Sequence, residues 1–257
     1  MKIFVIKAKN FYSICGLLAL CVTALFLGGL VLTNAAQVFT QSSQKLPVYS
    51  VETNDKKVSI TFDCAWGAND IPNILNTLKQ EKVKATFFLV GEWLDKFPNE
   101  SKAIAAGGHD IGNHSDAHLR MSQLSVNSMQ ADIANANAKI EKLTGQKCIL
   151  FRAPYGDFDE RLVKVAAGNG QYTIQWDVDS LDWKNISAGN ICERVMKKVK
   201  NGSIILLHND TKFTAIALPT LIKNLKNAGY SLVPVSELIY RDNYYMDYTG
   251  RQHSKKL

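Results

Sequence analysis

Short apolar runs alternate along the chain with segments in which apolar residues recur every three or four positions. The short runs are rich in β-branched and aromatic residues, which favours buried strands. The longer segments have the period of amphipathic helices, and several end at glycine, as helices commonly do. We expect strands within residues 58–63, 85–90, 109–115, 149–155, 172–180, 203–209 and 231–236.

Helices are expected between these strands, within residues 71–80, 93–107, 125–145, 161–170, 191–200 and 217–229. Such repeated strand–helix alternation is typical of a parallel sheet with right-handed crossovers, closed into a barrel or nearly so. The alternative is an open doubly wound sheet. No glycine-rich dinucleotide fingerprint follows the first strand, which disfavours that alternative.

An uncharged apolar run at residues 11–33 is long enough to cross a bilayer as a helix. Three lysines among residues 1–10 favour a cytoplasmic N-terminus and place the rest of the chain outside the cytoplasm. The alternative is a secretory signal cleaved near Ala35, but the run is longer than the roughly 7 to 15 residues of a signal core. We therefore expect residues 1–36 to be a flank and a single-pass membrane anchor.

The remaining boundaries follow from composition. Residues 37–56 are polar, contain Pro47 and show no sustained period, so they are predicted to be a linker. Residues 241–257 are polar and tyrosine-rich and are predicted to be a surface or disordered tail. The folded domain is expected to span residues 57–240.

Charge and cysteine content exclude some classes of protein. Apart from the three N-terminal lysines, 27 basic and 23 acidic residues leave a net charge of about +4, too mild to indicate a nucleic-acid partner. A modest positive balance suits an exported protein at an anionic cell wall. Cys64, Cys148 and Cys192 have no framework spacing, which argues against a disulfide scaffold and leaves only a Cys148–Cys192 bridge open.

Polar residues follow the carboxyl ends of the predicted strands, where α/β barrels carry their reactive groups. They are Asp63 and Cys64 after the first strand, His114 and His118 after the third, Arg152 and Tyr155 after the fourth, Asp179 and Asp182 after the fifth, and His208 after the sixth. Ordinary core or surface groups would scatter over both ends of the strands. The sequence therefore predicts one site at one rim.

His114 and His118 form the most specific local pattern. On one helical turn, residues four apart point the same way and can share a divalent cation. The alternative is a pair of surface histidines on a turn. Arg152 and His208 also have ordinary explanations, in a loop or a core, and only their common end of the fold links them to the histidine pair.

In this order the motifs resemble those of the polysaccharide deacetylases, the NodB-homology domain of carbohydrate esterase family 4. The matching segments are Thr61-Phe62-Asp63, His114-x-x-x-His118, Arg152-Ala153-Pro154-Tyr155-Gly156, Asp179-Ser180-Leu181-Asp182-Trp183 and Leu207-His208, within about residues 57–240. The membrane anchor on a short single-domain chain and the form Phe-Asp-x-x-Trp-Gly are most similar to the PdaB-type sporulation deacetylases.

The resemblance implies a deformed (β/α) barrel with seven strands and a metal-dependent removal of N-acetyl groups from a cell-wall glycan. The implied substrate is N-acetylglucosamine or N-acetylmuramic acid of peptidoglycan. By the resemblance, Asp63 is the general base and Arg152 holds it in place. His208 is the proton donor to the leaving amine, and Asp182 orients it.

The resemblance also implies residues that bind metal and substrate. His114 and His118 match two metal ligands. Tyr155 matches the position whose backbone N–H helps to hold the oxyanion, and Trp183 and Leu207 match walls of the acetyl pocket. We expect zinc, with cobalt or manganese as alternatives, and we expect a monomer.

Cys64 departs from the family pattern, which usually has a second aspartate there as a metal ligand. A thiolate binds zinc well, so a Cys-His-His set is one interpretation. Alternatively Cys64 is a buried spectator, and the cation is held by the histidines and water with help from Asp70.

Two other functions remain open from the sequence. The missing second carboxylate motivates a glycan-binding envelope protein that keeps the barrel but has lost turnover. An esterase that removes O-acetyl groups is the other, because a metal, a base and an acid serve esters as well as amides.

Overall fold

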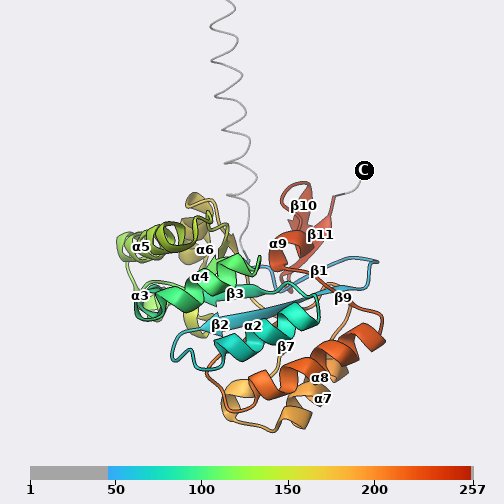
Figure 1. Cartoon of the computed structure of the whole chain (residues 1–257). Coiled ribbons are helices and arrows are strands. Elements are labelled where there is room, and N and C mark those ends of the chain that lie inside the picture. Colours follow the sequence, from blue (N-terminus) through green and yellow to red (C-terminus); the bar gives the residue numbers. More distant parts are fainter. Residues whose placement is uncertain (1–45, 256–257) are drawn as a thin grey trace, which may run out of the picture. The chain divides into compact units, whose positions relative to one another are not determined.

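The computed structural model describes residues 46–255, which are drawn in colour in Figure 1. The predicted membrane anchor, residues 11–33, lies outside this part of the chain. Within residues 46–255, no helix combines the length and the apolar character needed to cross a bilayer.

A curled parallel sheet forms the centre of the fold. In spatial order its strands are β6 (Tyr172–Thr173), β5 (Leu150–Phe151), β4 (Asp110–Asn113), β3 (Thr86–Leu89), β2 (Lys57–Cys64), β8 (Ile204–His208) and β7 (Val178–Asp179), with β9 (Ser231–Leu232) pairing with the start of β2. All neighbouring pairs on this path are parallel. The path does not join β6 to β7, so the sheet is a half-barrel that fits a deformed (β/α) barrel.

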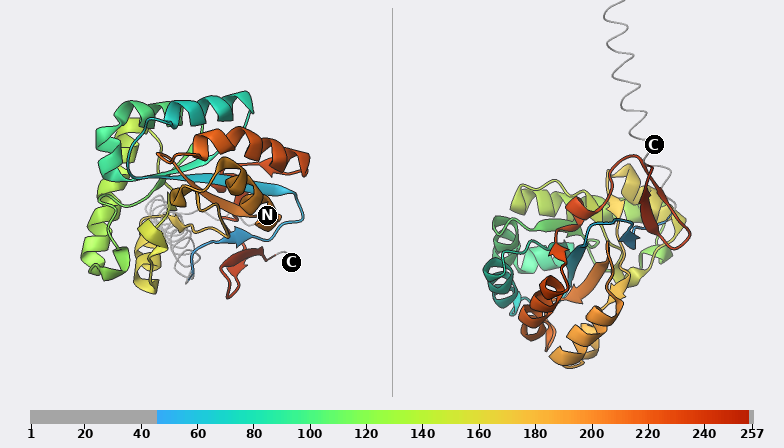
Figure 2. Two further views of the ribbon diagram at one scale, coloured as in Figure 1. Left: turned by 90° about the horizontal axis from the view of Figure 1, so that it is seen from below. Right: turned by 90° about the vertical axis from the view of Figure 1, so that its right-hand side faces the viewer.

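Helices surround the outer face of the sheet (Figures 1 and 2). They are α2 (Ile71–Gln80), α3 (Gly91–Lys96), α4 (Pro98–Ala106), α5 (Val126–Thr144), α6 (Glu160–Gly168), α7 (Ala188–Lys198) and α8 (Thr214–Asn227), and a short α9 (Val235–Leu238) follows β9. The contacts run from α6 to α5, α4, α2, α8 and α7, which is the order of the strands they follow. Right-handed crossovers between parallel strands produce this order.

Local sequence explains the ends of α5 and the buried face of α2. The Ser125 hydroxyl accepts a hydrogen bond from the Ser128 N–H at 3.1 Å and caps the start of α5. Gly145 ends this helix with φ 71°, a left-handed conformation that glycine adopts without steric cost. Ile74 and Leu78, four residues apart, lie on the buried side of α2.

Two segments predicted as single elements are divided. Residues 93–107 form α3 and α4 instead of one helix, because Pro98 disfavours a helical conformation at Phe97, whose φ is −127°. Residues 172–180 form β6 and β7 instead of one strand. These two strands lie at opposite edges of the sheet, so residues 174–177 cross its open side.

The segments predicted as linker and tail contribute to a second, small sheet. Its strands are β1 (Ser50–Val51), β11 (Arg251–Ser254) and β10 (Tyr244–Met246), with β11 in the middle. Val51 is buried, and the fully buried Gln252 side chain exchanges two hydrogen bonds of 2.7 Å with the Tyr240 backbone. Residues 50–51, 244–246 and 251–254 are therefore strands of the fold and not a linker or a disordered tail, although most of the tail lies at the surface as expected. Strands this short show no detectable period in the sequence.

The two faces of the sheet have different surroundings. Phe62 and Cys64 lie in the outer core between sheet and helices, whereas Phe88 and Ile174 pack inside the half-barrel. Successive side chains of a strand point to opposite faces. Asp63, between Phe62 and Cys64, therefore points into the half-barrel.

The three cysteines within residues 46–255 are all buried and free. The Cys148–Cys192 bridge that the sequence left open is not formed.

Candidate active site

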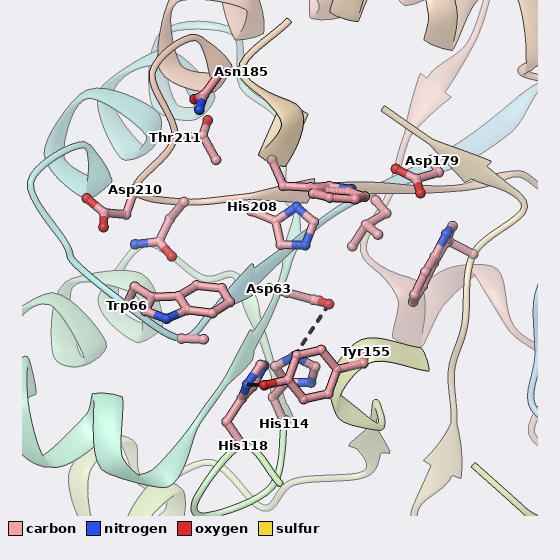
Figure 3. Close-up of a pocket in the computed structure, with 15 residues that line it drawn as sticks. Asp63, Trp66, His114, His118, Tyr155, Asp179, Asn185, His208, Asp210 and Thr211 are labelled. Atoms are coloured by element: carbon pink, nitrogen blue, oxygen red, sulfur yellow. Dashed lines mark hydrogen bonds and ion pairs between the residues drawn. The ribbon is translucent and has the colours of Figure 1, made fainter. Parts of the chain in front are cut away.

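The carboxyl ends of the strands open into a pocket of about 660 Å³ (Figure 3). The residues predicted from the sequence that line it are Asp63, His114, His118, Tyr155, Asp179, Trp183 and His208. Arg152 and Asp182 are fully buried and contact the lining residues from behind. The structure thus brings together side chains that are up to 145 positions apart in the chain.

Asp63 is the buried carboxylate of the pocket. It is the penultimate residue of β2 and pairs with His208 on β8. Arg152 donates to Asp63 Oδ1 at 2.6 Å and to Thr61 Oγ1 at 2.9 Å. Burial acts to raise the pKa of Asp63. The nearby charges, Arg152 first, outweigh burial and hold this pKa below its usual range. The carboxyl group is therefore ionised, and Arg152 leaves Oδ2 free.

His114 follows β4 and is fixed by its ring hydrogen bond. Its Nδ1 lies 2.8 Å from the Arg152 carbonyl oxygen, which can only accept, so Nδ1 carries the proton. Burial lowers the pKa of His114, and the charge of Asp63 offsets this only in part. The neutral ring then presents a bare Nε2, which lies 3.5 Å from Asp63 Oδ2. Two acceptors facing each other at this distance make a place for a cation.

His118 reaches the same place from a loop, not from the helical turn predicted by the i, i+4 spacing. Ser115 and His118 have φ values of 67° and 53°, which are left-handed, and the Asp132 carboxylate accepts from two successive loop N–H groups at 2.9 and 3.3 Å. The His114 and His118 rings are still neighbours, with centroids 5.1 Å apart. Burial lowers the pKa of His118 to about 4.

These two neutral imidazoles fit a divalent metal ion. Metal-binding histidines typically have their second ring nitrogen fixed by a carbonyl, a carboxylate or a similar group. His114 has the Arg152 carbonyl in this role, and His118 Nδ1 lies 3.1 Å from the Tyr155 hydroxyl. Among residues 46–255, no three His, Cys, Asp or Glu side chains form a complete ligand set. The residues present therefore fit an ion held by two histidines, with other positions open to water or substrate.

Cys64 does not belong to this site. Its side chain is fully buried in the outer core and is not part of the pocket lining. Burial, and then the charges of Asp63 and Asp70, raise the pKa of the thiol well above its usual value. The Cys-His-His interpretation is wrong in this structure, because alternation along β2 turns Cys64 away from the pocket. Asp70 is no substitute, since both its oxygens accept from the Asp210 N–H at 3.0 Å.

His208 stands across the pocket with a different partner. Its Nδ1 lies 2.8 Å from Oδ1 of the fully buried Asp182, whose Oδ2 accepts from the His208 N–H at 2.7 Å and from the Thr214 hydroxyl at 2.6 Å. Burial acts to lower the pKa of His208, but the hydrogen bond and charge of Asp182 outweigh it, and this pKa is raised. His208 can therefore carry a proton near neutral pH.

The walls of the pocket differ from the expectation at one position. Trp183 and Tyr155 line it, with Tyr155 in a left-handed turn of φ 60°. Leu207, predicted as a wall, is buried in the outer core, and Leu206 lines the pocket instead. The two-residue period of a strand puts Leu206 on the same face as His208, so the sequence already contained this signal.

Other residues of the site have no role that the sequence predicted. Trp66, which the sequence marks only as part of the form Phe-Asp-x-x-Trp-Gly, lines the pocket from the loop after β2. Thr214 and Asp132 hold Asp182 and the histidine loop in place. These contacts join residues far apart in the sequence, so no local pattern marks them.

The sequence and the fold are similar to those of known proteins. Residues 50–174 match the family model for polysaccharide deacetylases. The chain is 36% identical over 196 residues to a peptidoglycan-N-acetylglucosamine deacetylase of Bacillus cereus, covering 74% of this chain and 92% of the relative. The chain therefore belongs to the polysaccharide deacetylase family, as the motifs indicated. The uncharacterized protein YlxY of Bacillus subtilis is 36% identical, and the alignment spans 79% of this chain but only 63% of YlxY.

Solved structures of the same family include an inactive member. A carbohydrate esterase family 4 pseudoenzyme from Bacillus anthracis is similar with a TM-score of 0.74 and 37% identity, over 82% of this chain and 73% of that chain. A mutant of this pseudoenzyme described as having restored enzymatic activity is 38% identical, with a TM-score of 0.75 over 77% of this chain and 72% of that chain. Membership of the family alone therefore does not establish turnover.

Proposed function

We propose that this protein is a metal-dependent hydrolase that removes N-acetyl groups from peptidoglycan. One arrangement carries the proposal: a carboxylate fixed by Arg152 and a histidine fixed by Asp182 face the same pocket, beside two neutral imidazoles. Amide hydrolysis needs a base for water and an acid for the amine, and these two pairs supply them. The names of the relatives support peptidoglycan as the substrate.

His114 and His118 are the residues that would hold the metal ion. Such an ion, when bound, polarises the acetyl carbonyl and lowers the pKa of water toward about 7. We propose zinc, because imidazole ligands suit it, and cobalt or manganese as replacements. Cys64 takes no part, since its thiol lies in the outer core.

Asp63 acts as the base in this proposal. Its Oδ2 accepts a proton from the attacking water, while Arg152 holds Oδ1. His208 donates a proton to the leaving amine, because amine leaves poorly until it is protonated. Asp182 orients the His208 ring and keeps it cationic.

Three residues are proposed to contact the acetyl group of the substrate. The backbone N–H of Tyr155 is the proposed donor to the oxyanion. Trp183 and Leu206 line the pocket and are the proposed walls for the methyl group. Apolar side chains at these two positions can pack against the methyl group of an acetyl, while the polar groups of the pocket orient its amide.

Acetate release tests the proposal. The purified protein is incubated with zinc, cobalt or manganese and with N-acetylated chito-oligomers or muropeptides, and O-acetylated xylan serves as the ester control. We expect acetate from the N-acetylated glycans. Release from the ester alone would identify an O-acetyl esterase, and no release from any glycan with any metal would remove the proposal.

A glycan-binding protein without turnover is the second candidate, and Cys64 is the observation that favours it. The family carboxylate at this position is missing, and a related chain is a pseudoenzyme. The two candidates separate in one comparison. Calorimetric binding of wall fragments without acetate release, unchanged in Asp63→Asn and His208→Ala, would support the inactive protein.

We also propose that the protein is anchored in the cell membrane with its site outside the cytoplasm. The apolar run at residues 11–33 supports this proposal, as does a glycan substrate that lies in the wall. Cell fractionation and protease treatment of intact protoplasts test it, since an exported domain should be degraded. A role in sporulation rests on the resemblance, and the time of appearance of the protein during spore formation tests it.

A further inference from the structure

Trp66 has no role in the chemistry proposed above, yet it lies at the pocket. Its side chain is 60% exposed and lines the pocket, and its ring meets His118 edge-on with centroids 5.2 Å apart. Figure 3 shows the indole on the side of the pocket where Asp210 and His118 lie. Tryptophan is usually placed to bury its large apolar surface, and this one leaves most of it in solvent.

The loop that carries Trp66 is held rigidly. Gly67 donates to Asp210 Oδ2 at 2.9 Å, and its carbonyl accepts from Trp93 Nε1 at 2.9 Å and from the Asn209 side chain. Asp70, at the end of the loop, accepts from the Asp210 N–H. A Cβ at Gly67 would lie 2.5 Å from Asp210 Cγ, so a larger residue here would displace the Asp210 carboxylate that holds the loop. The backbone that carries Trp66 is thus anchored at the rim of the pocket, and the indole itself contacts the His118 ring.

An exposed aromatic ring that stands on an anchored loop and lines a pocket is suited to pack against a bound ligand. The ligand here must reach over the rim while its reactive group enters the pocket. A pyranose ring has an apolar C–H face that can lie on an indole, and its hydroxyl groups point sideways to water. The ring therefore fits the sugar next to the one that is deacetylated better than it fits a charged or a helical partner.

We propose that Trp66 is the stacking platform for a sugar ring of the glycan adjoining the N-acetylated sugar. This inference rests on the proposed glycan substrate and adds a second sugar-binding position to it. Trp66 is then a residue that sets substrate length and orientation, and it leaves the proton transfers to Asp63 and His208.

A length series of substrates tests the inference. In the unchanged protein KM should fall from the acetylated monosaccharide to the tri- and tetrasaccharide. In Trp66→Ala, KM for the longer oligomers should rise about tenfold, in line with the loss of one aromatic contact. We expect kcat and the monosaccharide to be unaffected, and Trp66→Phe to recover most of the affinity. Tyr248→Ala is the matched control, because Tyr248 is 94% exposed in a hairpin turn and does not line the pocket.

Two other measurements separate this inference from its alternatives. Zinc affinity, measured by calorimetry, should be equal in the unchanged protein and in Trp66→Ala; a loss would show that Trp66 only supports His118. If the unchanged protein releases no acetate, calorimetric binding of the tetrasaccharide decides, with weaker binding expected in Trp66→Ala. Equal KM or equal binding in the two proteins, or no glycan binding at all, would overturn the inference.

Discussion

The histidines on the two sides of the pocket have pKa values that are shifted in opposite directions. His114 and His118 have lowered pKa values because burial penalises their charged forms, and His118 reaches about 4. His208 is partly buried, but its bond to Asp182 raises its pKa. The difference lies in the ring partner: a carbonyl and a hydroxyl on one side, and a carboxylate on the other. Neutral rings suit metal binding and a cationic ring suits proton donation, so the environment assigns the roles.

The largest expected effect on activity comes from removing the proposed proton donor. His208→Ala should reduce the rate of acetate release by about 10² to 10⁴, the range for loss of a general acid. Zinc binding should persist, because His114 and His118 remain. Initial rates and calorimetry on the same preparation check both parts, and a variant with near-normal rate would remove His208 from the mechanism.

Replacing Arg152 tests whether the Asp63 carboxylate needs its buried charge partner. Arg152→Met leaves Asp63 with an uncompensated buried charge, and the free energy of unfolding should fall by about 3 to 5 kcal/mol. Arg161→Met is the matched control, since its pair with Asp159 is half exposed and should contribute less than about 1 kcal/mol. Denaturant unfolding gives both values. Equal small losses in the two variants would mean that the Arg152–Asp63 pair is not desolvated as the structure indicates.

The pH dependence sharpens the contrast further. The raised pKa of His208 means that the proton donor is present at neutral pH and is lost as pH rises through that pKa, so activity should fall on the alkaline side. Asp182→Asn removes the charge that raises the pKa, and the alkaline limb of kcat should move to lower pH. The pair also stabilises the fold below the ordinary histidine pKa of about 6.5, and this contribution is lost as pH rises through the raised value. An alkaline limb unmoved in Asp182→Asn would contradict the assignment.

Cys64→Ala should have the smallest effect on the site. The thiol lies in the outer core, so zinc affinity and acetate release should stay unchanged, and the cavity should cost about 1 kcal/mol of stability. Calorimetry with zinc and denaturant unfolding measure these quantities. Loss of zinc affinity would restore the thiolate ligand that the structure excludes.

The positions of the main strands, and the polar residues at their ends, were predicted correctly from the sequence. β2, β4 and β8 appear where alternation placed them, and their terminal Asp63, His114 and His208 meet in one pocket. The predicted helical turn at His114–His118 was wrong, because the conformation there depends on contacts with distant residues. The loop with left-handed Ser115 and His118 is stabilised by Asp132, which no local pattern links to it.

The structure was also needed to show which face of a strand each side chain occupies and which short strands pair with one another. Cys64 and Leu207 follow or precede functional residues by one position, and a motif alone does not say which of two neighbours points inward. Strand alternation places Leu206 on the same face as His208, and it places Cys64 on the opposite face from Asp63. The small β1–β11–β10 sheet joins two distant segments too short to have a period.

Anomalous scattering at the zinc edge, on crystals of the protein grown with zinc, tests the central claim most directly. The account predicts one peak in the pocket within bonding distance of ring nitrogens of His114 and His118, on the opposite side from His208. A peak bonded to the sulfur of Cys64, or a pocket without any peak at saturating zinc, would contradict it.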